Sequence, residues 1–196
     1  MRLDHIAYRV KDRYKTAKFL ENCLGYSIAV EFDLKFDDGS TTDCLGMNPP
    51  EERPVDVLEW DVLLADAEDV NNVTKTDFHA YHCPPEIFVS DGPEGSIVGD
   101  WVKERGSIGG IHHLAYQVED VEKIMKDWTD KGYAEWYSEK PLVCKETNLI
   151  QVFSKPSELT GVIYELITRG KDSKGFCQTN VKALMESTKD SKRKIK

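Results

Sequence analysis

Residues 3–10 read LDHIAYRV, and residues 111–118 repeat this pattern as IHHLAYQV. When the two stretches are aligned, His5 matches His113, and an alanine, a tyrosine and a valine also recur at matching positions. A helix-like segment follows each copy and ends in a Gly-Tyr pair. A repeat of this length indicates a duplicated module. Two modules related by pseudo-symmetry would direct the two histidines at one shared centre, which is how a duplication can build a metal site.

The composition is that of a globular protein with one compact domain or two fused modules. Hydrophobic residues make up 40% of the 196 residues, which is enough to form a buried core. The net charge of −9 argues against a nucleic-acid partner, because phosphate binding needs clustered Lys and Arg. We find no apolar run of membrane-spanning length and no signal-peptide pattern. We therefore expect a cytoplasmic protein that does not enter a membrane.

The cysteines predict a reduced protein. The chain has five of them, which are Cys23, Cys44, Cys83, Cys144 and Cys177. Their number is odd and they form no CxxC pair. We therefore expect free thiols, as in a cytosolic protein, and neither a disulfide framework nor a zinc knuckle.

The predicted elements repeat in the same order in the two halves of the chain. In the first half, residue alternation and helical spacing predict strands at 3–10, 26–36, 40–47 and 86–90 and helices at 13–24 and 96–105, and residues 55–64 are strand-like. In the second half they predict strands at 111–118, 133–138, 148–154 and 161–168 and a helix at 120–131. An amphipathic helix at 181–189 has no counterpart in the first half. Since neither half could bury a sheet face alone, we expect one curved mixed sheet that both halves complete.

Three side chains are candidate metal ligands. Residues at i and i+2 of a strand share a face, so His5 lies beside Ala7 and His113 lies beside Ala115, and the small alanines leave room for a concavity. Glu165 lies within the apolar stretch GVIYELITR, where burying an unpaired carboxylate would be expensive. Two histidines and one carboxylate form the ligand set of non-haem Fe(II) oxygenases, which keep open positions for substrate and oxygen.

These strands resemble a known family. LDHIAYRV, GIHHLAYQV and GVIYELITR are similar to the ligand strands of the vicinal oxygen chelate superfamily, which includes glyoxalase I, methylmalonyl-CoA epimerase and 4-hydroxyphenylpyruvate dioxygenase. The C-terminal third is similar to the catalytic domain of the dioxygenase in particular. Residues 149–156 resemble its LLQIFTKP segment, residues 164–169 its FEIIQR segment, and residues 175–176 and 180–187 its GFGxGNFKALFES tail.

The resemblance covers nearly the whole chain and implies an α+β fold. Two paired βαβββ modules would form a curved mixed sheet, or half-barrel, around a metal site, followed by a C-terminal helix. The first module would span residues 1–108 with an insertion at about 50–82, the second 109–170, and the C-terminal lid helix and basic tail 171–196.

The resemblance to the dioxygenase also implies roles for individual residues. His5, His113 and Glu165 would hold Fe(II), and Gln151 would point into the site and bind substrate. Phe176 would point into the cavity, and the last helix would cover its mouth. The implied activity is that of an Fe(II)-dependent dioxygenase that acts on an aromatic 2-oxo acid in aromatic amino acid catabolism.

Two other functions stay open. The stretch from Glu86 to the WVKERG helix resembles the epimerase pattern, in which Glu86 would be a fourth ligand. A divalent metal such as Co, Mn, Ni or Zn would then support proton transfer in an epimerase or lyase of the methylmalonyl-CoA epimerase or glyoxalase type. The third function is that of a non-catalytic small-molecule binding protein of the same fold.

The remaining expectations concern partners and the other histidines. We expect a small-molecule partner, either a 2-oxo acid or an acyl-CoA, and leave a homodimer open. His79 and His82 lie in a polar segment and are interpreted as surface residues. His112 precedes His113, so strand alternation predicts that it faces the opposite way and is structural.

Overall fold

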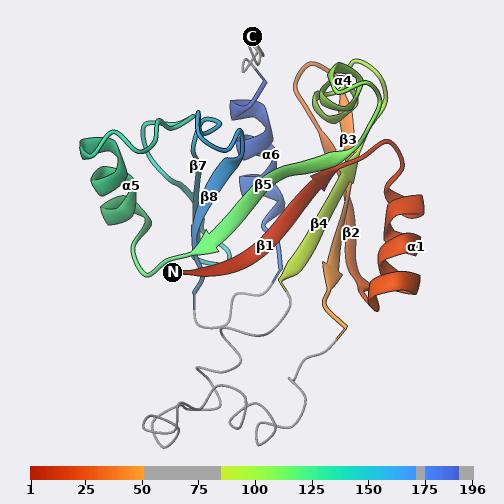
Figure 1. The fold of residues 1–196 in the computed structure, drawn as a ribbon, viewed down its shortest axis with the longest axis horizontal. Coiled ribbons are helices and arrows are strands. Elements are labelled where there is room, and N and C mark those ends of the chain that lie inside the picture. Colours follow the sequence, from red (N-terminus) through yellow and green to blue (C-terminus); the bar gives the residue numbers. More distant parts are fainter. Residues whose placement is uncertain (51–84, 171–174, 190–196) are drawn as a thin grey trace, which may run out of the picture.

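The computed structural model describes residues 1–50, 85–170 and 175–189, and its strands form one sheet. The strands are β1 (Arg2–Arg9), β2 (Ser27–Lys35), β3 (Thr41–Asn48), β4 (Glu86–Asp91), β5 (Gly110–Gln117), β6 (Leu142–Cys144), β7 (Leu149–Phe153) and β8 (Ile163–Thr168). The helices in the described part of the chain are α1 (Arg13–Leu24), α4 (Ile97–Glu104), α5 (Val121–Asp130) and α6 (Gln178–Ser187). Figure 1 shows the curled sheet, with α1 and α5 at its two sides and α6 near its middle.

The order of the strands confirms the predicted duplication. The sheet reads β2-β3-β4-β1-β5-β8-β7-β6. The two repeated strands, β1 and β5, pair antiparallel at its centre, and each has a parallel strand of its own module, β4 or β8, on its other side. The order is therefore the same when read outward from the centre in either direction, as expected for two βαβββ modules related by a pseudo-two-fold axis. The α+β fold of paired modules is as predicted.

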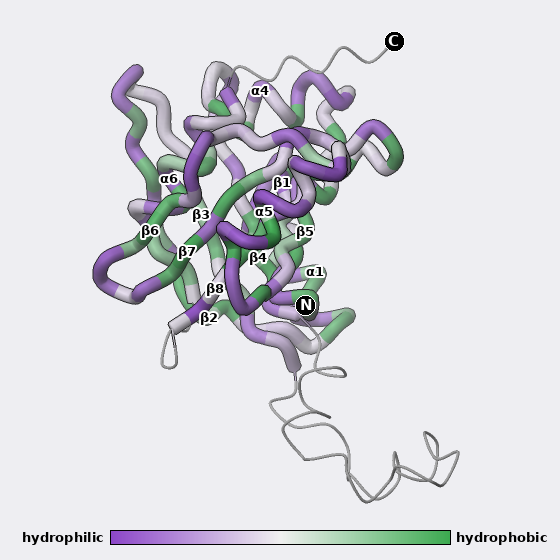
Figure 2. The backbone as a smooth tube through the Cα atoms, turned by 90° about the vertical axis from the view of Figure 1, so that its left-hand side faces the viewer, coloured by the Kyte–Doolittle hydropathy of each residue, from purple (hydrophilic) through white to green (hydrophobic). Residues whose placement is uncertain are grey.

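The two faces of the sheet pack against different helices. Leu20 of α1 shares a buried cluster with Ile87, and Val121 of α5 shares another with residues of β7 and β8. On the opposite face, Val181 of α6 belongs to a cluster that includes Phe88, the strand neighbour of Ile87. Figure 2 shows hydrophobic residues concentrated in the strands. The period-2 alternation thus separates an outer face under α1 and α5 from an inner face under α6.

Matching caps begin the two outer helices. The Asp12 carboxylate accepts a hydrogen bond from the backbone N–H of Lys15, and Asp120 does the same with Lys123. Such an N-cap contributes about 1 kcal/mol to helix stability. Gly25 ends α1 in the left-handed region, with φ of 75°, which a residue with a side chain adopts only under strain. The repeat therefore fixes the start of the helix in each module.

Part of the second module differs from the prediction. The strand predicted at 133–138 is absent: this segment has a single bridge between Trp136 and Ser154. The segment stays beside the end of β7, where Tyr137 N donates to the Phe153 carbonyl at 3.0 Å, while the Trp136 ring stacks on Trp128 of α5 and its Nε1 donates to Thr129 Oγ1 at 2.8 Å. The edge position is taken by β6, which we did not predict. The last helix begins at Gln178, three residues earlier than expected.

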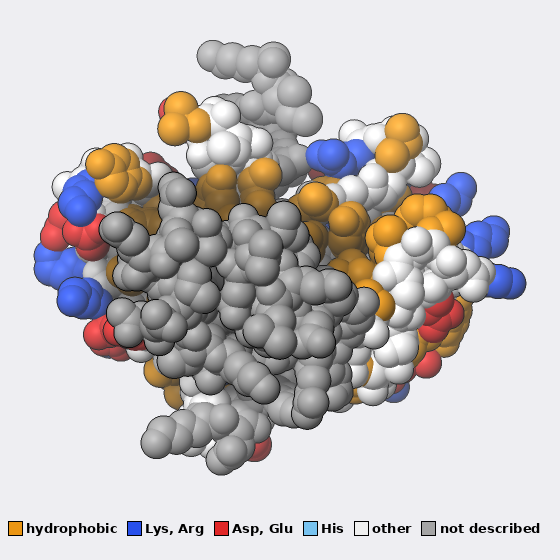
Figure 3. All heavy atoms as spheres, turned by 60° about the horizontal axis from the view of Figure 1, so that its bottom comes forward, with side chains coloured by type: hydrophobic (Ala, Val, Ile, Leu, Met, Phe, Trp, Pro, Cys, Tyr) orange, Lys and Arg blue, Asp and Glu red, His pale blue; other side chains and the backbone are white. Residues whose placement is uncertain are grey.

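Several expectations fall outside the described residues. They are the strand-like segment 55–64, most of the insertion at about 50–82, and the surface positions of His79 and His82. None of the described helices is both long enough and apolar enough to span a bilayer. On the face shown in Figure 3, basic and acidic side chains occur together on both flanks.

Candidate metal centre

Three strands bring two histidines and one carboxylate to one point on the inner face. His5 Nε2 lies 3.3 Å from His113 Nε2, and Glu165 Oε2 lies 3.3 Å from His5 Nε2 and 3.1 Å from His113 Nε2. All three side chains are buried. The register explains this, because Ala115 of β5 is the pairing partner of both His5 and Glu165. Only a small residue at this position lets the two flanking side chains meet above it.

These spacings fit a divalent metal ion. Donor atoms about 2.1 Å from an ion lie about 3.0 Å apart on an octahedral face and about 3.4 Å apart at the corners of a tetrahedron. The three distances in the cluster, 3.1–3.3 Å, fall within this interval. The donors are two imidazole nitrogens and a carboxylate oxygen, a set suited to iron, cobalt, manganese, nickel or zinc. The three residues could therefore hold one such ion without rearrangement.

Without a metal, the cluster holds a positive charge on His5. Burial alone would lower the pKa of His5, but the nearby Glu165 carboxylate and the Asp4 carboxylate outweigh it and raise the pKa to about 9. Burial alone would raise the pKa of Glu165, but His5 and His113 lower it to about 2. For His113 burial prevails and lowers the pKa. The ionised carboxylate is thus balanced by a proton on His5, which a metal cation would displace.

In both β1 and β5, the residue immediately before the candidate histidine ligand forms a β-bulge. The register between β1 and β5 skips Asp4 in β1 and His112 in β5, so each of the two strands has a β-bulge at that residue. His5 Nδ1 donates to Asp4 Oδ1 at 2.8 Å, and a hydrogen bond of 2.9 Å joins His112 Nδ1 and His113 Nδ1. Each ring is therefore held through Nδ1, and its Nε2 faces the centre.

The expectation for His112 is therefore wrong. Alternation predicted that it faces away from His113, but the bulge turns both side chains toward the inner face, and both line the same cavity. Sequence reasoning also missed Asp4. The identical placement of the two bulges shows that the duplication preserved a second feature besides the histidines themselves.

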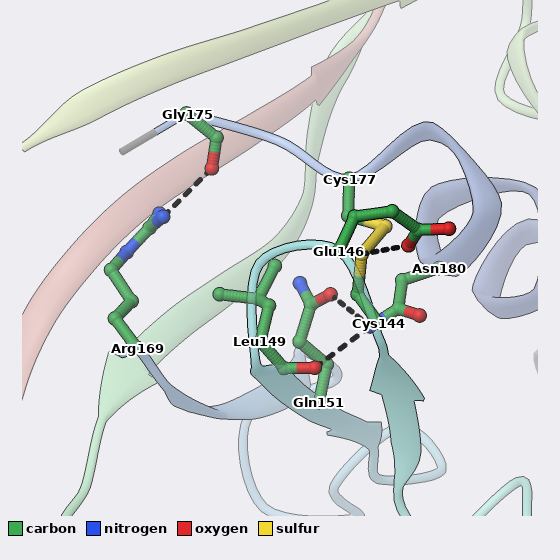
Figure 4. The surroundings of a disulfide bond; sticks show 8 residues. All are labelled: Cys144, Glu146, Leu149, Gln151, Arg169, Gly175, Cys177 and Asn180. Carbon is green, nitrogen blue, oxygen red and sulfur yellow. Dashed lines mark hydrogen bonds between the residues drawn. A yellow bond between two sulfur atoms is a disulfide. The ribbon is translucent and has the colours of Figure 1, made fainter. Parts of the chain in front are cut away.

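Arg169 connects the first histidine to the segment before α6. Its guanidinium makes two hydrogen bonds of 2.7 Å to the Asp4 carboxylate and donates to the backbone carbonyl of Gly175 at 2.7 Å. Figure 4 shows the contact with Gly175. Burial alone would raise the pKa of Asp4, but the hydrogen bonds from Arg169 and His5 hold it well below its usual range. Asp4 is thus a fixed negative charge behind His5.

Gln151 and α6 hold the carboxylate. Gln151 Nε2 donates to Glu165 Oε1 at 2.5 Å, and Asn180 of α6 donates to Gln151 Oε1 at 2.9 Å and to the Leu149 carbonyl at 3.3 Å. The Asn180 contacts are drawn in Figure 4. One oxygen of Glu165 is therefore engaged by Gln151, while the other faces the histidines. Gln151 lines the cavity, and its role in binding substrate stays a prediction.

The predicted lid lies over the cluster. The Phe176 ring packs edge-on against His5 at 5.0 Å and lies 4.8 Å from the Phe88 ring. Gly46 of β3 leaves the room that this needs, since a Cβ there would come within 3.0 Å of the Phe176 ring. Residues of α6, including Leu184, complete the wall of a cavity with a volume of about 30 Å³. That is room for one or two water molecules, so a larger ligand enters only if the lid moves.

Glu86 does not join the cluster. Its side chain is 31% exposed, and its carboxylate lies 3.8 Å from the Arg169 guanidinium. The register gives the reason. Ala115 pairs with Glu165, and in the first module the matching alanine, Ala7, pairs with Phe88. The place where pseudo-symmetry would put a fourth ligand is therefore occupied by an aromatic ring.

The expectation of free thiols is wrong for two cysteines. Cys144 at the end of β6 and Cys177, the residue before α6, form a disulfide (Figure 4). Among the described cysteines, Cys23 and Cys44 are free. The pairing joins residues 33 positions apart. No spacing motif in the sequence predicts this disulfide, because its formation depends on where α6 docks.

Comparison with known proteins identifies the family. The model of the Glyoxalase/Bleomycin resistance protein/Dioxygenase superfamily matches residues 4–142, and the chain belongs to this superfamily. No curated protein sequence matches the chain.

Solved structures share the fold. A methylmalonyl-CoA epimerase has 16% identity and a TM-score of 0.58, with 87% of this chain and 97% of that chain covered. The Streptomyces coelicolor methylmalonyl-CoA epimerase has 22% identity and a TM-score of 0.55, with coverages of 87% and 98%. A mutant of 4-hydroxymandelate synthase from Streptomyces coelicolor has 16% identity and a TM-score of 0.68, and the match covers 95% of this chain but 54% of the synthase.

Proposed function

We propose that this protein is an Fe(II)-dependent dioxygenase of the 4-hydroxyphenylpyruvate dioxygenase type that acts on an aromatic 2-oxo acid. The observation that carries the proposal is the three-residue ligand set. His5, His113 and Glu165 converge, and Phe88 stands where a fourth ligand would be. A site with two histidines and one carboxylate leaves open positions for a chelating substrate and oxygen, as non-haem iron oxygenases require.

The surroundings of the cluster support the same function. The Phe153 ring lies 4.6 Å from the His113 ring, and Phe88 and Phe176 pack on the side of His5. These rings give an apolar wall that suits an aromatic substrate. The structural match to 4-hydroxymandelate synthase covers more of this chain than the epimerase matches cited above, 95% against 87%.

The chain's own residues position and protect the reaction. Bound Fe(II) would supply the oxygen chemistry, which protein side chains cannot carry out. Gln151 holds Glu165 in one orientation, and Asp4 holds His5. Phe176 and α6 leave room in the small cavity for only one or two water molecules, which matters where a reactive oxidant must attack the substrate alone.

Metal analysis and oxygen uptake test the proposal. Protein purified without oxygen should contain about one Fe(II) per chain and consume oxygen with 4-hydroxyphenylpyruvate. Glu165→Ala should lower metal affinity by at least about a hundredfold, because a direct ligand is lost. The matched control is Glu135→Ala, which removes an exposed carboxylate paired with Lys155 and should keep the metal. Normal iron content in Glu165→Ala would exclude the triad.

A metal-dependent epimerase or lyase is the second candidate. The observation in its favour is length, since two epimerase structures match over 97% and 98% of their own chains. In that case Glu165 or a neighbouring group would move a proton at a substrate carbon. Exchange of a substrate C–H for deuterium without oxygen uptake would favour this function. A non-catalytic binding protein would show neither exchange nor oxygen uptake.

A further inference from the structure

The disulfide lies at the base of the lid over the metal centre. Cys177 is the residue before α6, and it follows Phe176, whose ring packs against His5. Cys144 ends β6, the short strand at one edge of the sheet, which is in contact with α6. The bond therefore ties the segment that carries Phe176 to the edge of the sheet (Figure 4).

The bond limits how far this segment can move. The Cα atoms of Cys144 and Cys177 lie 6.5 Å apart, and a closed disulfide does not let two Cα atoms separate beyond about 7 Å. Consecutive Cα atoms are about 3.8 Å apart. The Cα atom of Phe176 therefore stays within about 11 Å of that of Cys144 for as long as the bond is closed.

Non-covalent contacts hold the same segment less firmly. The Arg169 guanidinium donates to the Gly175 carbonyl at 2.7 Å, and Asn180 donates to Gln151 Oε1 at 2.9 Å. Each hydrogen bond of this kind contributes only about 1–3 kcal/mol, so local opening breaks it transiently, whereas a covalent bond stays closed. The disulfide thus decides whether the lid can open for a molecule larger than the cavity of about 30 Å³.

The bond lies just below the protein surface. Glu146 is exposed, and its Oε2 lies 3.1 Å from Cys144 Sγ. Gln178, the neighbour of Cys177, is exposed as well. A small dithiol therefore needs only a local motion to reach the sulfur atoms. Once the bond is reduced, the Cys144 thiol can donate a hydrogen bond to the Glu146 carboxylate, which stabilises the reduced form.

We propose that Cys144 and Cys177 form a redox lock on the lid, which a dithiol reductant opens. A thiolate of the reductant attacks the Cys177 sulfur, and the Cys144 sulfur leaves and takes up a proton. The second thiol of the reductant then displaces Cys177, so the reductant becomes a disulfide and the protein gains two electrons and two protons. The lid stays closed on average in both states, because its hydrogen bonds remain, but only the reduced protein opens often. This inference rests on the candidate metal centre and not on the dioxygenase activity.

Hydrogen exchange measures the opening without a metal. In the metal-free full chain, reduction should speed exchange of the α6 amides at least about tenfold more than that of the β1 and β5 amides, which report global unfolding. Cys144→Ser/Cys177→Ser should exchange like the reduced protein with or without reductant, whereas Cys23→Ser, which removes an exposed free thiol, should keep the response. An equal acceleration in α6 and the central strands, or none in α6, would overturn the lock.

Release of Co²⁺ measures access to the centre. The chain is loaded with one Co²⁺, and the visible absorption of the bound ion is followed after addition of excess EDTA. The ion should leave Cys144→Ser/Cys177→Ser at least about tenfold faster than it leaves the oxidised wild type. The serines also remove two thiols that, with Glu146, could bind the ion themselves. Cys23→Ser should match the wild type.

The outcomes separate the lock from the other proposals. Equal release rates in the oxidised wild type and the double serine variant would overturn the lock. If neither form takes up Co²⁺, the metal centre is wrong, and hydrogen exchange alone decides whether the bond restrains the lid. Oxygen uptake enters neither measurement, so a failed dioxygenase assay would leave the lock standing.

Discussion

Reduction of the Cys144–Cys177 disulfide should lower the free energy of unfolding by about 4 kcal/mol. The bond closes a loop between residues 33 positions apart. The chain-entropy relation for a loop of this length gives about 12.5 cal/mol/K, or about 3.7 kcal/mol at 25 °C. The effect arises mainly in the unfolded chain, which gains freedom when the loop opens. In the folded protein both cysteines are buried, so the thiols would remain packed at the start of α6.

Urea unfolding with and without a reductant measures this difference. With a slope of about 2 kcal/mol/M, the midpoint should fall by about 2 M when the bond is reduced. The double variant Cys144→Ser/Cys177→Ser should unfold near the lower midpoint and show no response to the reductant. Cys44 is buried and free, so Cys44→Ala is a control that should keep the response.

Two results would refute this reasoning. Five reactive thiols in denatured but unreduced protein would show that the bond does not form. A midpoint that stays constant, although alkylation shows that two further thiols have been released, would show that the loop is already constrained in the unfolded chain. The first result would also remove the disulfide as a tether that keeps α6, and with it Asn180, over Gln151.

The remaining predictions concern the metal centre. Glu86→Gln should keep its iron, and loss of iron measured by metal analysis would indicate a four-ligand site. Asp4→Asn should weaken metal binding about ten- to a hundredfold in a competition titration, because the support behind His5 is lost. Phe176→Ala should keep the metal but release less product per oxygen consumed, because water enters the cavity; unchanged coupling would exclude a shielding role. In metal-free protein, the pKa of Glu165 falls to about 2, so the stabilisation from this carboxylate is complete above its ordinary pKa and is lost as the pH falls through about 2. The pKa of His5 rises to about 9, so the stabilisation from this imidazole is complete below its ordinary pKa and is lost as the pH rises through about 9. Unfolding at a series of pH values should therefore show this contribution at its largest between about pH 4.5 and 6.5, and a steady increase from there to pH 9 would contradict the assigned charges.

The placement of the three candidate ligands could be predicted because it depends on simple periodicities. The repeat aligned His5 with His113, strand alternation gave the face, and the apolar neighbours of Glu165 indicated burial. The cluster needs nothing more than correct register between adjacent strands, and the register is set by the same alternation of buried and exposed residues. Local pattern and global fold agree at these positions.

The supporting residues could not be predicted because they depend on exceptions to alternation. Asp4 and His112 reach the histidines only because one extra residue interrupts each strand, and nothing in the local sequence distinguishes a bulge from a regular strand. The pairing of Cys144 with Cys177 depends likewise on the docking of α6. The segment around Trp136 forms one bridge to Ser154 rather than a full strand, and the Trp136 ring stacks on Trp128 of α5, a contact that depends on the tertiary fold.

The duplication explains the frame of the site, and its asymmetry explains the chemistry that the site can support. The second module contributes His113, Glu165 and the supporting Gln151, whereas the first contributes a single ligand. In place of a second carboxylate the first module has Phe88, which packs with Phe176 beside His5. A symmetric centre would surround an ion with protein ligands from both sides and leave less room for substrate. Replacing one carboxylate by an aromatic ring removes a ligand and adds an apolar wall. Under the proposed function, the aromatic acid would therefore bind on the side of the centre that the first module forms.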